Sequence, residues 1–313
     1  MNPASNESAP TVISPIAPLP VDSLNATLAP LLAVLIWTGN TLVTKIAAVA
    51  IDPGSIAFYR WVLAFLVLTP FVGRAAWQHR AIIGDHWRKL AVLGGLGMAM
   101  YQGLAYEAAR TTSAVNMGVI VAMMPLLAAL LASVLSAETL STRQIVGAVI
   151  SLMGLVVLTT RGQPAALLGG DIHIGDGLML IAVASNALYG VLLRRWALPL
   201  STWQQLYVQV GFGVLVLLPF WVAGPMSAIT PANAPLILYA GTAASIGAPF
   251  FWMTAVKRLG AARASLFMNL LPILVALAAW AFLDEQLHLY HATGAAITLL
   301  GIRVGLRQTQ VRR

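Results

Sequence analysis

Polar side chains able to bind a ligand lie deep inside apolar stretches of this chain. Asn40, Asn186 and Asn269 are flanked on both sides by apolar residues. An amide surrounded by hydrocarbon needs a partner, so all three should face other helices or a cavity. Asn40 and Asn269 either bind a ligand or join two helices, and both are candidate ligand-binding residues. Joining helices is the favoured role of Asn186.

Aromatic side chains accompany these amides. Tryptophan and tyrosine usually gather at the membrane interface, but Trp37 and Tyr101 lie too deep for that position. Gln102 lies one helical turn from Tyr106, which adds an amide to the same stripe. Aromatic walls with a few amides suit a small ligand with an apolar side chain. The predicted ligand-binding residues are Trp37, Asn40, Tyr101, Gln102, Tyr189, Trp252 and Asn269.

Two prolines lie near the middle of apolar stretches, at Pro125 and Pro272. A proline inside a helix removes the bond to the carbonyl four residues earlier and bends the helix. The carbonyls freed in this way would be those of Val121 and Met268. In hydrocarbon such carbonyls are tolerated only beside protein or a water-filled cavity. We therefore predict that both prolines are hinges beside a binding site.

Several kinds of chemistry are disfavoured. No acidic residue is expected mid-span, where an exporter of cations driven by protons would need one. Lys45 and Arg60 lie towards the ends of spans and are predicted to extend to the headgroups. Without a cation at the midplane, phosphorylated sugars are poor ligands. No phosphate-binding GxxxxGK[ST] loop occurs, so ATP is not expected to drive the protein.

Metals and cofactors are not expected either. His288 and His291 form one pair of possible ligands, and Asp171 and His173 form another. Two ligands do not make a metal site, and both pairs fall in predicted loops. The chain has no cysteine, which excludes thiolate chemistry.

The elements that position these residues are membrane helices. The chain has 313 residues, of which 59% are hydrophobic and only 9% charged, compared with about 25% charged in soluble domains. Bilayer thickness requires about 20 apolar residues per span. Residues 1–26 are rich in proline without Lys or Arg, and are predicted to be a disordered tail. Ten spans are predicted at 27–49, 56–73, 89–108, 114–136, 142–160, 176–194, 203–223, 235–256, 262–283 and 291–306.

One segment occurs twice. Residues 125–154 and 272–301 align without a gap at an offset of 147, with 12 of 30 positions identical. Pro125, Glu138, Gly147 and Gly154 each meet the same residue type in the second copy. Span four therefore corresponds to span nine, so each copy has five spans. Because five is odd, the second copy crosses the membrane in the opposite sense to the first. The expected fold is all-α and integral to the membrane, with repeats at 27–160 and 176–306 and a linker at 161–175. The glycines are predicted to let neighbouring helices approach closely.

The basic residues predict the orientation. With a cytoplasmic N-terminus, 14 of the 18 Lys and Arg residues fall in inner segments, including the basic tail 307–313. This bias satisfies the positive-inside rule. We expect both termini in the cytoplasm and the protein in a bacterial-type inner membrane.

The sequence resembles a known family of membrane transporters. The Trp37-x-Gly39-Asn40 motif with Lys45, Arg60 and the duplicated Pro125…Glu138…Gly147…Gly154 series is similar to EamA-type members of the drug/metabolite transporter superfamily. Within it, the chain looks most like the YddG-type exporters of aromatic and other neutral amino acids. The resemblance spans residues 27–306 and implies export of such amino acids by alternating access.

Other functions remain as alternatives. The same fold could export drugs or nucleoside-like metabolites. An intramembrane enzyme would need a nucleophile and a base within reach, yet the histidines fall in loops or at span ends. A channel would leave a continuous polar stripe, whereas the polar residues here gather near the midplane. The expected partners are a small-molecule substrate and lipid, with no nucleic acid, and the chain could act as a monomer.

Overall fold

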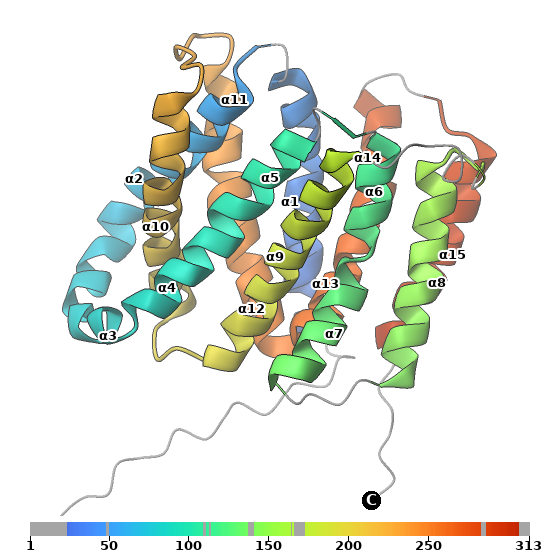
Figure 1. Ribbon diagram of the computed structural model, residues 1–313, viewed down its shortest axis with the longest axis horizontal. Coiled ribbons are helices and arrows are strands. Elements are labelled where there is room, and N and C mark those ends of the chain that lie inside the picture. Colours follow the sequence, from blue (N-terminus) through green and yellow to red (C-terminus); the bar gives the residue numbers. More distant parts are fainter. Residues whose placement is uncertain are drawn as a thin grey trace, which may run out of the picture.

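The computed structural model describes residues 24–47, 50–108, 111–112, 114–136, 141–163, 165, 173–282 and 286–306. Within these residues the regular secondary structure is entirely helical, and the helices pack into one bundle (Figure 1). Several predictions lie outside the described residues. They concern the N-terminal tail up to residue 23, the tail 307–313, most of the linker, Asp171, Glu138 and the side chain of Lys45.

Among the residues that the structure describes, eight helices or runs of helix are long and apolar enough to cross a membrane. Four of them are the single helices α1 (Leu24–Ala47), α2 (Pro53–Gln78), α9 (Ile174–Trp196) and α10 (Thr202–Ala223). Two more are α8 (Thr142–Thr159) and α15 (Leu289–Leu306). The last two are composite: α11 (Ala234–Gly241) with η3 (Ala243–Gly247) and α12 (Ala248–Leu259), then α13 (Ala261–Leu266) with η4 (Phe267–Leu270) and α14 (Leu271–Phe282). Helix α1 begins three residues before the predicted span.

The predicted spans 89–108 and 114–136 are not among these eight, and each is divided into shorter helices. The first consists of α4 (Trp87–Gly94), η1 (Gly95–Met100) and α5 (Tyr101–Ala108). The second consists of α6 (Ala114–Ala122) and α7 (Met124–Ser136), which meet at a turn at Met123. A short helix, α3 (Arg80–Asp85), connects α2 to α4 at one end of the bundle (Figure 1).

Two interruptions are π-helical and were not predicted. Both η1 and η3 are π-helices, whose backbone bonds reach five residues back and accommodate one surplus residue. At the offset of 147, η1 corresponds to residues 242–247, which include the whole of η3. The widened turns are formed largely of glycine and alanine, which do not crowd neighbouring side chains. The two copies therefore share a helix defect as well as sequence.

Both mid-span prolines stand at the second residue of a helix, Pro125 in α7 and Pro272 in α14. The first turn of a helix tolerates proline because its N–H would have no partner there. The preceding helix is already broken, at Met123 in one copy and by the 3-10 turn η4 in the other. In that turn the Leu271 N–H donates to the carbonyl of Met268. The expectation that Met268 keeps a free carbonyl is therefore wrong.

The duplicated glycines form a seam between α8 and α15, which lie side by side in Figure 1. A Cβ on Gly154 would lie 2.5 Å from the backbone nitrogen of Thr298. A Cβ on Gly147 would lie 2.6 Å from the carbonyl oxygen of Gly301. The later residue of α8, Gly154, faces the earlier residue of α15, Thr298, so the two helices run antiparallel. Only glycine permits this backbone approach.

Candidate functional site

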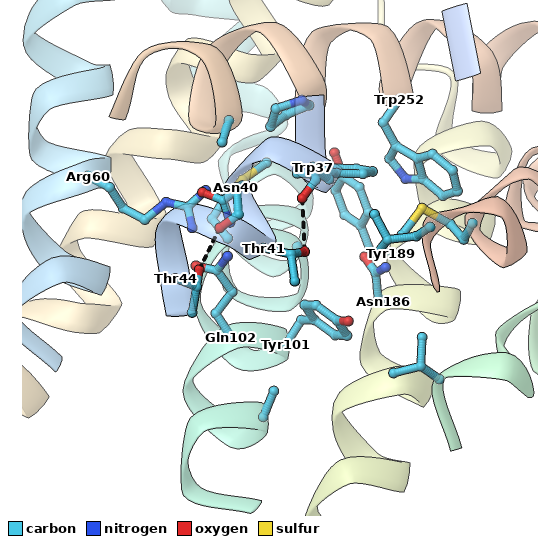
Figure 2. Close-up of a pocket in the computed structure, with 18 of the residues that line it drawn as sticks. Trp37, Asn40, Thr41, Thr44, Arg60, Tyr101, Gln102, Asn186, Tyr189 and Trp252 are labelled. Atoms are coloured by element: carbon cyan, nitrogen blue, oxygen red, sulfur yellow. Dashed lines mark hydrogen bonds between the residues drawn. The ribbon is translucent and has the colours of Figure 1, made fainter. Parts of the chain in front are cut away.

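A cavity of about 380 Å³ lies inside the bundle. Residues of α1, α2, η1, α5, α6, α9, η3, α12, η4 and α14 line it (Figure 2). Six of the seven predicted ligand-binding residues are among them: Trp37, Asn40, Tyr101, Gln102, Tyr189 and Trp252. Helix α2 also contributes, through Arg60 and Trp61, although it carries none of the predicted ligand-binding residues. That these residues bind a substrate stays a prediction.

Among the described residues that line the cavity, Arg60 has the one charged side chain. It is only 2% exposed, and its Nε donates a hydrogen bond of 2.7 Å to Ser245 Oγ of η3. Its guanidinium carbon also lies 5.3 Å from the ring centroid of Trp61. The prediction that Arg60 extends to the headgroups is wrong, because the side chain points into the bundle. Placing an arginine of a membrane helix at the centre of the bilayer costs at least about 2.5–3.5 kcal/mol of insertion free energy. We therefore expect Arg60 to have a functional role.

Local sequence fixes the part of α2 that carries Arg60. Asp52 caps the helix by accepting from the Ser55 N–H at 3.1 Å, and Pro53 follows the cap. Ser55 Oγ donates to the carbonyl of Pro225 at 3.2 Å. The Tyr59 hydroxyl donates to the carbonyl of Ser227 at 2.8 Å. These contacts anchor the first two turns of α2 against the segment that follows α10.

Amides lie near Arg60 at the polar end of the cavity. Figure 2 shows the guanidinium directed towards Asn40 and Thr44, with Gln102 close by. Asn40 Oδ1 and Gln102 Oε1 are buried acceptors with no hydrogen-bond donor in the part of the chain that the structure describes. A buried polar atom without a partner costs about 1–3 kcal/mol. The polar end therefore combines a cation with acceptors that an ammonium group could satisfy.

Aromatic rings form the opposite end. The rings of Trp37 and Trp252 are 5.8 Å apart between centroids and tilted by 58°. Tyr189 lies against Gly97 of η1, where a Cβ would be 2.8 Å from two ring carbons. The Tyr189 hydroxyl donates to Gln209 Oε1 at 3.1 Å, which fixes the ring. Arg60, Asn40 and Gln102 thus lie towards one end of the cavity, and the rings of Trp37, Trp252 and Tyr189, with the amide of Asn186, lie towards the other (Figure 2).

Asn269 and Asn186 both form contacts between helices, and only Asn186 also lines the cavity. Asn269 does not line the cavity; it is 1% exposed, and its Nδ2 donates to Ser151 Oγ of α8 at 2.8 Å. The 3-10 turn η4 changes the helical phase, so Asn269 faces the seam. Asn186 lines the cavity and also links two helices, as favoured, since its Nδ2 donates to Met124 Sδ of α7 at 3.6 Å.

The two proline breaks adjoin the site. Val121 and Met268, each four residues before a proline, line the cavity, and neither proline does. A rotation at either break would therefore move a wall of the cavity. Within the described residues, no group of three His, Cys, Asp or Glu side chains could hold a metal ion.

The EamA-like transporter family model matches residues 24–160 and 173–306. The chain belongs to this family. It is accordingly a multi-pass membrane protein of a transporter family, with helices whose length and apolar composition suit a bilayer. The family assignment by itself names no substrate.

Relatives of this EamA-family chain extend over most of its length. It is 26% identical over 287 residues to the "Uncharacterized transporter YyaM" of Bacillus subtilis, covering 87% of this chain and 90% of that one. It is also 26% identical over 224 residues to a "Probable terminal-alkyne amino-acid exporter" of Streptantibioticus cattleyicolor, covering 72% and 74%. A crystal structure with 21% identity superposes with a TM-score of 0.70 over 90% of this chain and 96% of that chain, which shows a shared fold.

Proposed function

We propose that this EamA-family protein is a secondary transporter that exports small amphiphilic metabolites. The best candidates are neutral amino acids with bulky apolar or aromatic side chains, as in the YddG-like exporters. The two-ended cavity carries this proposal, because Arg60 and the amides match charged groups while the rings of Trp37 and Trp252 match an apolar body. The amino-acid exporter of Streptantibioticus cattleyicolor adds support.

The proposed arrangement has ten spans in two inverted repeats, at 27–160 and 176–306, joined by the linker 161–175. Both termini would be cytoplasmic. The antiparallel seam between α8 and α15 supports an inverted relation, because the Thr298 hydroxyl donates across it to the carbonyl of Ser151, one repeat away. The matched π-helices η1 and η3 support it independently of sequence identity.

Transport would proceed by alternating access. The breaks beside Pro125 and Pro272 divide two spans into halves, and Val121 and Met268 connect those breaks to the cavity wall. Tilting of one half against the other would open the cavity to one side of the membrane at a time.

Counterflow in proteoliposomes tests the proposal. Vesicles loaded with unlabelled phenylalanine should accumulate labelled phenylalanine in a saturable manner, and protein-free vesicles should not. A panel of amino acids, nucleosides and planar drugs should show preference for neutral amino acids with large side chains. A preference for nucleosides or drugs would favour the alternative exporters, and flux that does not saturate would favour a channel.

A further inference from the structure

We infer that Arg60 is the carboxylate-binding residue of the cavity, and that its ligands are carboxylates whose apolar end lies between Trp37, Trp252 and Tyr189. This inference deepens the proposed function and rests on it for the assignment of the cavity as a transport site. The ligand class that fits best is an α-amino acid held by both of its charged groups.

The first argument is electrostatic. Arg60 places a full positive charge in a cavity whose described lining residues include no Asp or Glu. An arginine is charged at every pH that a protein meets, and its planar fork matches a carboxylate. A ligand carboxylate would therefore gain a charge-assisted hydrogen bond in surroundings of low dielectric constant.

The second argument is orientation. The guanidinium is held rather than loose, since its Nε is bonded to Ser245 Oγ at 2.7 Å and its plane lies near the ring of Trp61. The bond from Nε to Ser245 therefore fixes the direction in which the guanidinium presents its positive charge. Figure 2 shows the side chain extended from α2 into the cavity towards Asn40.

The third argument concerns the second charge of the ligand. At this end of the cavity, Asn40 Oδ1 and Gln102 Oε1 accept no hydrogen bond from the residues that the structure describes. An ammonium group has three donors and no acceptor, so it would satisfy both oxygens. In an α-amino acid the ammonium and the carboxylate sit on one carbon, which suits an arginine and two amide oxygens at one end.

The fourth argument is the position of the rings. The Trp37–Trp252 pair and Tyr189 lie across the cavity from Arg60 (Figure 2). A ligand whose carboxylate meets Arg60 therefore directs its side chain towards them. A cavity of about 380 Å³ accommodates an aromatic amino acid.

Matched ligands test the inference on the purified full chain in detergent. The probes are phenylalanine, phenylalaninamide (no carboxylate charge), 3-phenylpropionate (no ammonium) and 2-phenylethylamine (no carboxylate). Binding is measured as ligand-dependent thermal stabilisation. Wild type should bind phenylalanine at least tenfold more tightly than phenylalaninamide or 2-phenylethylamine. Equal binding of phenylalanine and its amide would overturn the inference, whatever the variants do.

Variants then assign the discrimination to Arg60. Arg60→Gln should weaken phenylalanine at least tenfold and change phenylalaninamide by less than twofold. Arg60→Lys keeps the charge without the fork and should retain part of the preference, which also covers the case that Arg60→Gln does not fold. Arg74→Gln, an exposed arginine on the same helix, is the matched control. Equal loss for both ligands in Arg60→Gln would make Arg60 a structural link to Ser245 and overturn the inference.

The two proposals fail in different ways. If amino acids undergo counterflow but phenylalanine and phenylalaninamide bind equally well, the proposed function stands and this inference is rejected. Arg60-dependent binding of 3-phenylpropionate without binding of phenylalanine keeps the carboxylate site and removes amino-acid export. If no probe binds, both are rejected.

Discussion

The ring of Tyr189 lies directly on the backbone of Gly97, so that a Cβ at Gly97 would be 2.8 Å from the ring atoms Cδ2 and Cε2. This pair joins α9 to the π-helix η1 at the wall of the cavity. The ring cannot withdraw easily, because its hydroxyl is bonded to Gln209.

Gly97→Ala should therefore push Tyr189 out of place. We expect a loss of about 1–3 kcal/mol in the free energy of unfolding, typical of overpacking, with a larger relative loss of phenylalanine counterflow. Gly95→Ala is the matched control in the same π-helix, since a Cβ there meets nothing within 4 Å. Equal effects of the two substitutions would contradict the conclusion that the Tyr189 ring is positioned by packing against Gly97.

The α8–α15 seam should be more sensitive than any cavity position. In Gly301→Ala the new Cβ would lie 2.6 Å from the Gly147 oxygen and 2.7 Å from the Ser151 Cα. Backbone cannot move aside as a side chain can, so the two helices must separate. We expect a lower melting temperature in detergent.

Gly177→Ala in α9 is the control for the seam, because no atom lies within 4 Å of its Cβ. An alanine in a helix is favoured over glycine by about 1 kcal/mol, so this variant should be unchanged or more stable. A Gly301→Ala protein as stable as the control would show that the seam is looser than described.

Asn269 is expected to act on stability rather than on transport specificity. Asn269→Ala removes the bond to Ser151 Oγ and should cost about 0.6–1.7 kcal/mol, the range measured for hydrogen bonds between membrane helices. A double-mutant cycle with Ser151→Ala, read by thermal unfolding, should show that the two losses are not additive. If Asn269→Ala changes the order of preferred substrates, Asn269 takes part in substrate binding and this prediction is wrong.

The proline breaks make a kinetic prediction. Pro125→Ala and Pro272→Ala supply an N–H that can bond to Val121 or Met268 and allow each pair of half-helices to merge. Counterflow should fall severalfold, whereas the free energy of unfolding should change by only about 1 kcal/mol or less. Normal flux in both variants would exclude a hinge role.

Membrane topology can be mapped with reporters. Fusions in the Arg80–Asp85 segment and at the C-terminus should report the cytoplasmic side, as the distribution of basic residues requires. A fusion in the Pro225–Ser227 segment should report the opposite side. An external location of the Arg80–Asp85 segment would overturn the orientation.

The amides and rings around the cavity were predictable because of where they lie in the sequence. Asn40, Trp37 and Tyr101 stand deep in apolar spans, where a polar or amphipathic group must face inward. Arg60 was missed because it lies in the second turn of α2, where position alone does not separate a residue facing the bundle from one reaching the headgroups.

Other features depended on helical phase, which the sequence does not display. A continuous α-helix through residues 262–283 would turn Asn269 towards the cavity, but η4 has three residues per turn and turns it to the seam. The π-helices η1 and η3 likewise carry no pattern that distinguishes them from ordinary α-helix. Composition and duplication thus predicted the helices and most of the cavity lining, and missed the local changes of pitch.

The surplus residue in η1 also separates the two ends of its helix. The α4 half packs on α10 and the α5 half packs on α9, with η1 touching both. Removing one residue from Gly95–Met100 would restore α-helical pitch and leave each half facing its partner, because the widened turn already accommodates the surplus residue. Elsewhere in an α-helix a single-residue deletion turns the following residues by about 100°, whereas at this point it need not change which surface each half presents. Related transporters could differ in length here while keeping both packing faces, and alignments should be allowed a gap at this turn.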